Sequence, residues 1–523
     1  MTMDKNLLIG IAATLMPAWM HAQSEKPKNV LFIAVDDLND WVGFMKGHLN
    51  TRTPNMDRLA AMGMVFESAY CAAPVSNASR AALLSGFRTS TTGVYGNAEF
   101  MRESPVLKDA VTLPKYFSNH GYYSMARGKI FHQPMGPWGD PQSWDSQENL
   151  GGLSLNPPRQ KGKQANGLEK QTTGGAVILD WAGVDVDETK TNDYLNAQWA
   201  AQELMKKHDK PFFMACGIFR PHLPWYVPQK YFDRFKLEDI QLPKQDPMET
   251  MEKLSPRALS MTGYNKPEHE FNILKKYGME KEAVRAYLAC ISYADDCIGQ
   301  IVDALEKSPE RDNTIVVFWG DHGWHLGEKM RYRKFSLWDR SCHVPMIIVA
   351  PGVTKPGSVC KQPVSLLDLY PTLVSLAGLP ANSLNEGNDI TPLLQNPNAH
   401  WTKPAITTLA QNEHSICDGR YRYIIYRDGS EELYDHQYDP LEWKNLAADK
   451  KYAEVKARLR AFIPKVNVPS IGKAHISKSA GEKPAKGLKG KKLTSSLDII
   501  EQECIEYNLS LIHISEPTRQ EAI

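Results

Sequence analysis

The chain has 523 residues, of which 42% are hydrophobic and 23% are charged, and its formal net charge is +1. This composition is typical of a globular protein large enough for two domains, and the balanced charge gives no indication of a nucleic-acid partner. The eight cysteines are scattered without a C-x-x-C pair, which argues against a zinc ribbon or a thioredoxin-like centre and leaves one or two disulfides open.

Residues 1–22 are predicted to form a cleaved signal peptide. Lys5 gives a positive start, Leu7–Pro17 is a short apolar run, and Ala22 ends a plausible cleavage site. The run is too short for a bilayer anchor, so we expect a secreted, periplasmic protein that does not span the membrane. A buried N-terminal helix is the alternative, and it fits less well because the polar stretch Ser24–Asn29 separates the run from the first strand.

The next part of the chain alternates between apolar runs and segments with helical spacing. In chain order these patterns predict strand Val30–Val35, helices Thr53–Gly63 and Asp109–Gly121, strand Tyr122–Ala126, helix Asn192–His208, strand Pro211–Gly217, helix Glu280–Lys307, and strands Thr314–Trp319 and Val344–Ala350. Helices that alternate with buried strands indicate an α/β fold with a large, mainly parallel sheet between helices. Active sites in such sheets lie beyond the carboxyl ends of the strands.

Two further regions have a different pattern. Gln133–Thr191 is polar, rich in Gly, Pro and Asn, and has little periodicity, so we predict a surface excursion that could shape a substrate cleft. From Glu386 onward the short strands Ala405–Leu409, Tyr421–Tyr426 and Glu432–Tyr434 and the helix Lys451–Phe462 indicate a small C-terminal α+β subdomain.

These patterns divide the chain into a catalytic domain, 26–385, and the subdomain, 386–468. Residues 469–508 form a predicted disordered tail, since Ser470–Thr494 carries seven lysines among Gly, Ala and Ser. Residues 509–523 resemble a translated sequencing-library adapter and are left out of the fold prediction.

The strongest chemical motif is Ser76-Asn77-Ala78-Ser79-Arg80, followed by an apolar stretch that ends at Ser85-Gly86. Taken alone, Ser76 could simply cap a helix that begins near Ser79. The whole string resembles the signature of the type I, formylglycine-dependent sulfatases, in the form of their serine-type bacterial members. The resemblance implies that Ser76 is oxidised to formylglycine by a serine-competent, radical S-adenosylmethionine maturase.

A pair of metal-binding residue types follows each of two predicted strands. Asp36 and Asp37 come directly after the first strand, and Asp321-His322 comes after a later one. A turn or a helix cap would explain either pair alone, whereas carboxylates that converge at the edge of one sheet suit Ca²⁺. The resemblance implies that all four residues bind Ca²⁺, with residue 76 completing the shell. For His322 this assignment depends on the resemblance alone.

Three more segments match the family locally: Gly128-Lys129-Ile130-Phe131-His132, Arg220-Pro221-His222-Leu223-Pro224, and Lys334 after Gly327-Glu328. The resemblance therefore implies that Lys129, His132, His222 and Lys334 join Ser76 and Arg80 in the catalytic site. It extends from about Asn29 to Leu446 and implies an alkaline-phosphatase-like sandwich. Strings such as Val35–Leu38, Thr91–Asn97 and Glu432–Asp435 are similar to the iduronate-2-sulfatase-like branch.

The resemblance also implies a mechanism. A hydrated aldehyde at residue 76 supplies a hydroxyl that attacks sulfur, with Asp321 as the base and Arg80 orienting the hydrate, and its second hydroxyl then releases sulfate. One of His222 and His132 protonates the departing sugar oxygen and the other stabilises residue 76. The sulfate oxygens are held by Ca²⁺, Lys129, Lys334 and His222.

The predicted partner is a sulfated oligosaccharide, first of all one with a 2-O-sulfated uronic acid of a glycosaminoglycan. A sulfated algal galactan or another sulfated glycan is the alternative substrate. A phosphoesterase of the same fold is a second alternative, although such enzymes usually need two metals and more histidine ligands. An inactive glycan-binding protein is the third, and it would follow if Ser76 were never oxidised.

Overall fold

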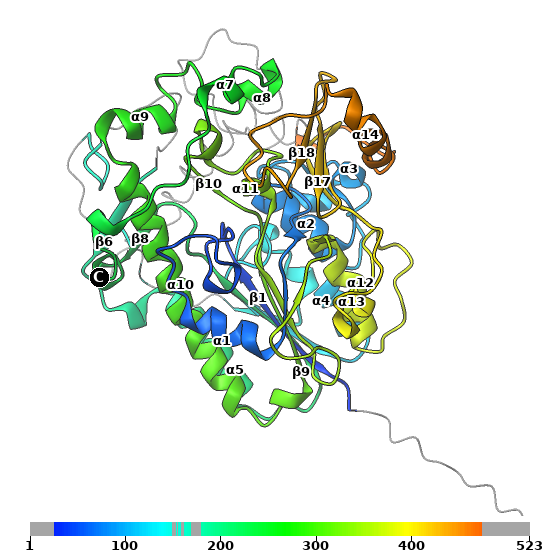
Figure 1. The fold of residues 1–523 in the computed structure, drawn as a ribbon. Coiled ribbons are helices and arrows are strands. Elements are labelled where there is room, and N and C mark those ends of the chain that lie inside the picture. Colours follow the sequence, from blue (N-terminus) through cyan, green and yellow to red (C-terminus); the bar gives the residue numbers. More distant parts are fainter. Residues whose placement is uncertain (1–25, 149–152, 154, 158–161, 169–178, 473–523) are drawn as a thin grey trace, which may run out of the picture.

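The computed structural model describes residues 26–148, 153, 155–157, 162–168 and 179–472 (Figure 1). The predicted signal peptide, the tail from residue 473 and the adapter-like residues 509–523 lie outside this part of the chain. They stay predictions, as does the domain boundary at residue 386. No helix within the described residues is long and apolar enough to cross a membrane.

An eight-stranded sheet forms the centre of the molecule, with the strand order β13-β2-β12-β9-β1-β7-β4-β5. Its strands are β1 (Asn29–Val35), β2 (Met64–Phe66), β4 (Tyr123–Arg127), β5 (Ser146–Glu148), β7 (Phe212–Ile218), β9 (Thr314–Gly320), β12 (Met346–Val349) and β13 (Ser358–Cys360). All neighbours are parallel except β12, which is antiparallel to both β9 and β2. The predicted α/β class with a mainly parallel sheet is therefore confirmed.

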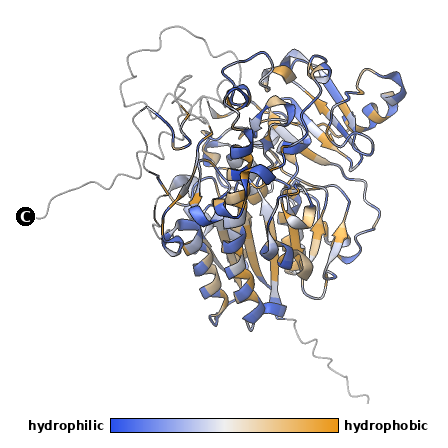
Figure 2. Cartoon of the chain, turned by 60° about the vertical axis from the view of Figure 1, so that its left-hand side comes forward, coloured by the Kyte–Doolittle hydropathy of each residue, from blue (hydrophilic) through white to orange (hydrophobic). Residues whose placement is uncertain are grey.

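Helices cover both faces of this sheet (Figure 1). One face packs against α1 (Pro54–Met62), α5 (Asn192–Leu204) and α10 (Glu280–Lys307), and the other against α2 (Ser76–Ser85), α4 (Leu113–Asn119) and α12 (Leu369–Leu376). A hydrophobic core lies on each side of the sheet. Successive residues of β1 belong alternately to one core and the other, because the side chains of a strand point to opposite faces. Figure 2 shows the hydrophobic strands enclosed between helices whose outer surfaces are hydrophilic. Burial on both faces explains the uninterrupted apolar runs in the sequence.

The strand register aligns the chemical motifs at one edge of the sheet. Val35 at the end of β1 lies opposite Gly320 of β9 and Ile218 of β7, and Arg127 of β4 lies opposite Cys216. Because these four strands are parallel neighbours, the segments that follow them leave the sheet side by side. This edge is where an open α/β sheet places its active site.

A second, antiparallel sheet forms the C-terminal subdomain. Its strands, in spatial order, are β15 (Ala405–Ala410), β16 (Glu413–Cys417), β17 (Tyr421–Ile425) and β18 (Glu431–Asp435), and α14 (Ala453–Arg460) packs on it through Leu459. This confirms the predicted α+β character. β16 is absent from the sequence prediction because its polar residues, Glu413 and His414, are buried by partners from distant segments.

The remaining strands and helices are short. They are β3 (Ala69–Tyr70), α3 (Thr89–Thr92), β6 (Trp181–Val184), β8 (Trp225–Pro228), α6 (Gln229–Asp233), α7 (Met248–Met251), α8 (Pro256–Ser260), α9 (Glu270–Tyr277), β10 (His325–Leu326), β11 (Tyr332–Arg333), α11 (Asp339–Cys342), β14 (Val364–Ser365) and α13 (Thr391–Gln395). β5 and β6 lie within the predicted polar excursion, whose role in a substrate cleft stays a prediction. The seven described cysteines are all buried and free, so no disulfide forms among them.

Candidate active site

The residues predicted from the motifs meet in one buried cluster at the carboxyl edge of the large sheet. All of them lie in its interior, and the His222 side chain is the most accessible, at 11% exposed. The cluster comprises Asp36, Asp37, Ser76, Arg80, Lys129, His132, His222, Asp321, His322 and Lys334.

Ser76 is the first residue of α2, and its hydroxyl points into the cluster. Ser76 Oγ lies 2.9 Å from His322 Nε2 and 3.4 Å from Asp36 Oδ1, and it accepts a hydrogen bond of 3.0 Å from Lys334 Nζ. The helix begins at Ser76 rather than near Ser79, and its N-cap is Val75, which has no side-chain cap. The alternative that Ser76 only caps a helix is therefore wrong.

Arg80 lies one turn further along α2 and connects several parts of the site, because residues four apart share a helix face. Its Nε donates to Asp321 Oδ2 at 2.9 Å and its Nη2 donates to Asp36 Oδ1 at 3.1 Å. Nη1 donates to the carbonyl oxygens of Lys129 and Ile130 at 2.7 and 2.9 Å. The guanidinium thus fixes two carboxylates and the backbone that follows β4.

Two lysines face the acidic pair at the end of β1. Lys129 Nζ donates to Asp36 Oδ2 and Lys334 Nζ donates to Asp37 Oδ1, each at 2.6 Å. Gly128, just before Lys129, has a φ of +78°, and a Cβ there would lie 2.0 Å from the carbonyl oxygen of Gly217. Only glycine permits this close approach of the segments after β4 and β7, which places Lys129 beside β1.

The electrostatics of the cluster follow from burial and from these ion pairs. Burial raises the pKa of Asp36 to about 7, against the opposing effect of Lys129. Burial would also raise the pKa of Asp321, but Arg80 and His322 hold it well below its usual range. Burial lowers the pKa of His322 to about 4. His322 is therefore neutral at pH 7, and a neutral imidazole can offer a nitrogen lone pair to a metal.

His222 and His132 complete the cluster. His222 Nδ1 donates to the Leu223 carbonyl oxygen at 2.6 Å, so its Nε2 faces the site, 3.8 Å from Asp37 Oδ2. His132 is almost fully buried. Burial holds the pKa of both histidines well below its usual range. His222 has the side chain better placed to meet a group that enters from solvent.

The donor set fits a hard divalent cation. One ligand atom each from Asp37, Asp321 and His322 lies within 4.8 Å of the others, and Asp36 and Asp37 form a second such group with His222. Asp37 Oδ2 is buried and accepts no hydrogen bond from any described residue. A buried carboxylate oxygen without a donor is costly unless a cation satisfies it. Converging carboxylate oxygens favour Ca²⁺ among the common cations.

The sequence prediction missed several supporting residues. Asn77 Nδ2 donates to the carbonyl oxygens of Gly96 and Glu99, and Ser79 Oγ donates to the Asp321 carbonyl at 2.6 Å. Both residues lie inside the motif around Ser76, so the motif itself contained the signal. Asp193 of α5 accepts from the backbone nitrogens of the two residues before Pro221, and nothing in the sequence pointed to this contact.

Ser76 lies between carboxylates, lysines and histidines at the carboxyl edge of a mainly parallel sheet covered by helices, which is an alkaline-phosphatase-like fold. Comparison with known proteins gives the family within that fold class. The sulfatase family profile matches residues 28–379, and that of the N-sulphoglucosamine sulphohydrolase C-terminal region matches residues 320–468. The chain therefore belongs to the sulfatase family and is a sulfuric ester hydrolase.

Individual relatives agree with this assignment. A sulfatase of Formosa agariphila is 38% identical over 452 residues, covering 85% of this chain and 87% of its own. Human iduronate 2-sulfatase is 30% identical over 399 residues, covering 67% of this chain and 69% of its own. Among solved structures, a phosphonate monoester hydrolase of Agrobacterium radiobacter has a TM-score of 0.66 at 21% identity, covering 83% of this chain and 95% of its own. At that identity the likeness concerns the fold alone.

Proposed function

We propose that this enzyme removes the 2-O-sulfate from uronic acid units of a glycosaminoglycan. The observation that carries the proposal is the environment of Ser76 Oγ, which contacts His322 and Lys334 beside the carboxylate of Asp36. The similarity to human iduronate 2-sulfatase supports the choice of sugar over an algal galactan. Phosphate esters are the less favoured substrate, because the sulfatase family profile matches most of the chain and the relatives from Formosa agariphila and human are sulfatases.

The proposal includes conversion of Ser76 to formylglycine by a serine-competent maturase. An aldehyde at this position supplies, when hydrated, a nucleophilic hydroxyl and a second hydroxyl through which sulfate can be released. Ser76 is fully buried in the folded chain, so we expect the conversion to take place before folding. Lys334 and His322, which contact the Ser76 oxygen, would then orient the modified side chain.

The metal in this proposal is Ca²⁺, held by Asp36, Asp37, Asp321 and His322 together with the oxidised residue 76. When bound, Ca²⁺ would attract the sulfate oxygens and stabilise negative charge that develops on them. Asp37 Oδ2, which no described residue satisfies by a hydrogen bond, is available for this ligand set.

The remaining roles go to residues of the chain itself. Lys129 and Lys334 place two ammonium groups beside the position that the sulfate oxygens would occupy. They therefore bind the sulfate and stabilise its negative charge. Asp36 Oδ1 lies 3.4 Å from the Ser76 oxygen, and Arg80 links it to Asp321. Asp321 accepts the proton of the attacking hydroxyl. His222, the most accessible site residue, protonates the departing sugar oxygen from Nε2, which takes up a proton when the negative charge of a bound sulfate raises the pKa of the imidazole.

The test is sulfate release by protein that has been co-expressed with a serine-competent maturase. The substrates are a 2-O-sulfated uronate disaccharide, a 6-O-sulfated hexosamine, sulfated galactan oligosaccharides, an aryl sulfate and an aryl phosphate. We expect the highest kcat/KM for the uronate, and mass spectrometry should find the Ser76 peptide lighter by two hydrogens. Ser76→Ala is the matched control and should fold but release no sulfate.

Each alternative has its own result in this assay. A higher kcat/KM for a galactan or a hexosamine would replace the proposed sugar, and a higher value for the aryl phosphate would favour a phosphoesterase. If Ser76 stays unmodified even after co-expression with the maturase, and the protein binds the oligosaccharides but hydrolyses none, the chain is a glycan-binding protein. Full activity of protein that contains only unmodified serine would refute the formylglycine proposal.

A further inference from the structure

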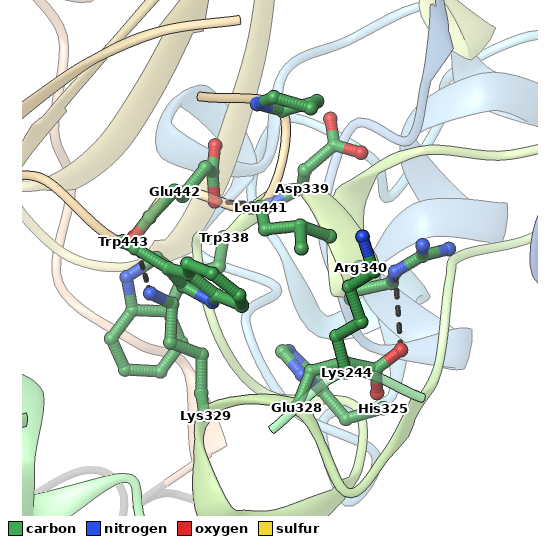
Figure 3. Close-up of a pocket in the computed structure, with 11 residues that line it drawn as sticks. Lys244, His325, Glu328, Lys329, Trp338, Asp339, Arg340, Leu441, Glu442 and Trp443 are labelled. Atoms are coloured by element: carbon green, nitrogen blue, oxygen red, sulfur yellow. Dashed lines mark hydrogen bonds and ion pairs between the residues drawn. The ribbon is translucent and has the colours of Figure 1, made fainter. Parts of the chain in front are cut away.

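The C-terminal part of the chain contacts the catalytic domain at more than one place. Loop 440–443, which includes Trp443, meets Lys244 and the β10–β11 hairpin around a narrow pocket (Figure 3). Another contact is made by residues 467–472, which we call the C-terminal strap. The strap packs against the segment that follows α2, the helix that begins at Ser76.

The C-terminal strap connects the C-terminal sheet to the end of α3. At its beginning, Asn467 Oδ1 lies 2.8 Å from Nε2 of His414, a buried residue of β16. Further along, the backbone nitrogen of Ile471 donates to the carbonyl oxygen of Gly93 at 3.1 Å. Gly93 has a φ of +76°, and a Cβ there would lie 2.6 Å from the carbonyl oxygen of Pro469. Only glycine permits this close approach of the strap to the catalytic domain.

Glu99 joins the C-terminal strap to the turn 95–99. Its side chain is buried, and its Oε2 accepts hydrogen bonds from the backbone nitrogens of Tyr95 and Gly96, the latter at 2.5 Å. Its Oε1 accepts a hydrogen bond from Ser470 Oγ. One carboxylate therefore closes the turn and binds it to the strap.

The turn 95–99 holds the beginning of α2. Asn77, the residue after Ser76, donates from Nδ2 to two carbonyl oxygens of the turn, at 2.8 and 2.7 Å. Its backbone nitrogen donates to Asn97 Oδ1 at 3.2 Å. The first backbone nitrogens of a helix have no acceptor within the helix, so they depend on acceptors outside it. The position of Ser76 is thus fixed by the turn as well as by α2 itself.

We propose that Glu99 is a positioning residue for Ser76 and that the C-terminal strap acts on the catalytic site through it. The inference rests on the proposed function, in which residue 76 reacts. When the Glu99 carboxylate is removed or released from the strap, the turn loosens and Asn77 loses its acceptors. Residue 76 then moves relative to Lys334 and His322. A displacement of this kind lowers the rate because the reacting groups must be held in one geometry.

The test compares Glu99→Ala, Glu99→Gln and Ser470→Ala in the full-length, maturase-treated enzyme. Glu99→Ala should lower kcat by up to about 100-fold with little change in KM. Mass spectrometry should find that the amide of Asn77 exchanges with deuterium about tenfold faster. Glu99→Gln should recover most of both losses, because an amide can accept from the turn and donate to Ser470. Ser470→Ala should show the same two effects at smaller size.

Asp295→Asn is the matched control. Asp295 is also a buried carboxylate that accepts from backbone nitrogens, those of Asn55 and Met56 at the beginning of α1. That helix packs on the opposite face of the large sheet from α2. Asp295→Asn should therefore speed exchange at Met56 and leave kcat and the exchange of Asn77 unchanged.

Several results would overturn the proposal. One is an equal loss of kcat in Asp295→Asn and Glu99→Ala, and another is a change in KM alone. A third is an unchanged exchange rate at Asn77 in both Glu99→Ala and Ser470→Ala. In the double variant of Glu99 and Ser470 the two losses should not add, since the strap acts through Glu99, and additive losses would refute this route. If the enzyme without substitutions releases no sulfate, the proposed function fails, whereas exchange at Asn77 still decides whether Glu99 and the strap hold this position.

Discussion

The role of Arg80 leads to the sharpest prediction about the site. Its side chain is only 1% exposed and makes four hydrogen bonds, two of them to the carboxylates of Asp36 and Asp321. Replacing it with methionine keeps much of the volume but removes the positive charge. Both carboxylates would then stay buried with one counter-charge fewer.

The expected loss is large because the ion pairs are fully buried. Removing one partner of a buried ion pair costs about 3–5 kcal/mol, since the remaining charge is left without compensation. Folded proteins are stable by only about 5–15 kcal/mol, so Arg80→Met should lower the denaturation midpoint strongly. Arg80→Lys keeps the charge but cannot reach both carboxylates and both carbonyl oxygens. It should fold better, and its kcat should fall about 100-fold because the carboxylates are misplaced.

The assay is denaturant unfolding of each variant with and without saturating Ca²⁺. A bound divalent cation would supply positive charge to the same two carboxylates, so Ca²⁺ should recover part of the stability that Arg80→Met loses. Lys403→Ala, an exposed change, serves as the control and should show no such recovery. If Ca²⁺ stabilises Arg80→Met no more than the unmodified enzyme, then Arg80 and the metal do not share Asp36 and Asp321, and the assignment of ligands is wrong.

Three further predictions concern the metal, the acid and the subdomain. Chelation should abolish turnover and lower the melting temperature, and added Ca²⁺ should restore both; active enzyme in which elemental analysis detects no divalent cation would contradict the ligand set. His222→Gln should lower kcat for sugar sulfates about 10²–10⁴-fold but affect an aryl sulfate with a good leaving group much less, and equal losses would argue against a proton donor. Arg422 of β17, 1% exposed, forms ion pairs with Asp339 and Glu442 at 2.6 and 2.7 Å and so joins the C-terminal sheet to α11. Arg422→Met should cost about 3–5 kcal/mol in urea unfolding, and a change below about 1 kcal/mol would show that this link is dispensable.

Sequence alone could predict the parts of the fold that depend on local patterns. Apolar runs such as Val30–Val35 identify buried strands because a strand covered on both faces needs apolar side chains at every position. The pairs Asp36-Asp37 and Asp321-His322, which follow two such strands, predicted the site together with the motif at Ser76. Parallel strands end at one edge, so polar residues placed directly after them must meet.

Other features depended on contacts between distant segments, which no local pattern contains. The antiparallel direction of β12 and the buried polar strand β16 follow from their neighbours in the sheets rather than from their own sequences. The role of Ser76 at the start of α2 also depends on distant residues. Its hydroxyl contacts His322 and Lys334 instead of capping the helix.

The sequence by itself determined the fold class, the family and which residues meet in the cluster around Ser76, because these depend on local periodicity and on contiguous motifs. Only the tertiary structure decided how their charges are balanced, with Arg80 between Asp36 and Asp321 and a lysine on each of the paired aspartates. It also decided that Trp443 and Lys244, far apart in the chain, line one pocket. The physical reason is that ion pairing and pocket shape depend on distances of a few ångströms between side chains, and those distances exist only after the strands have paired.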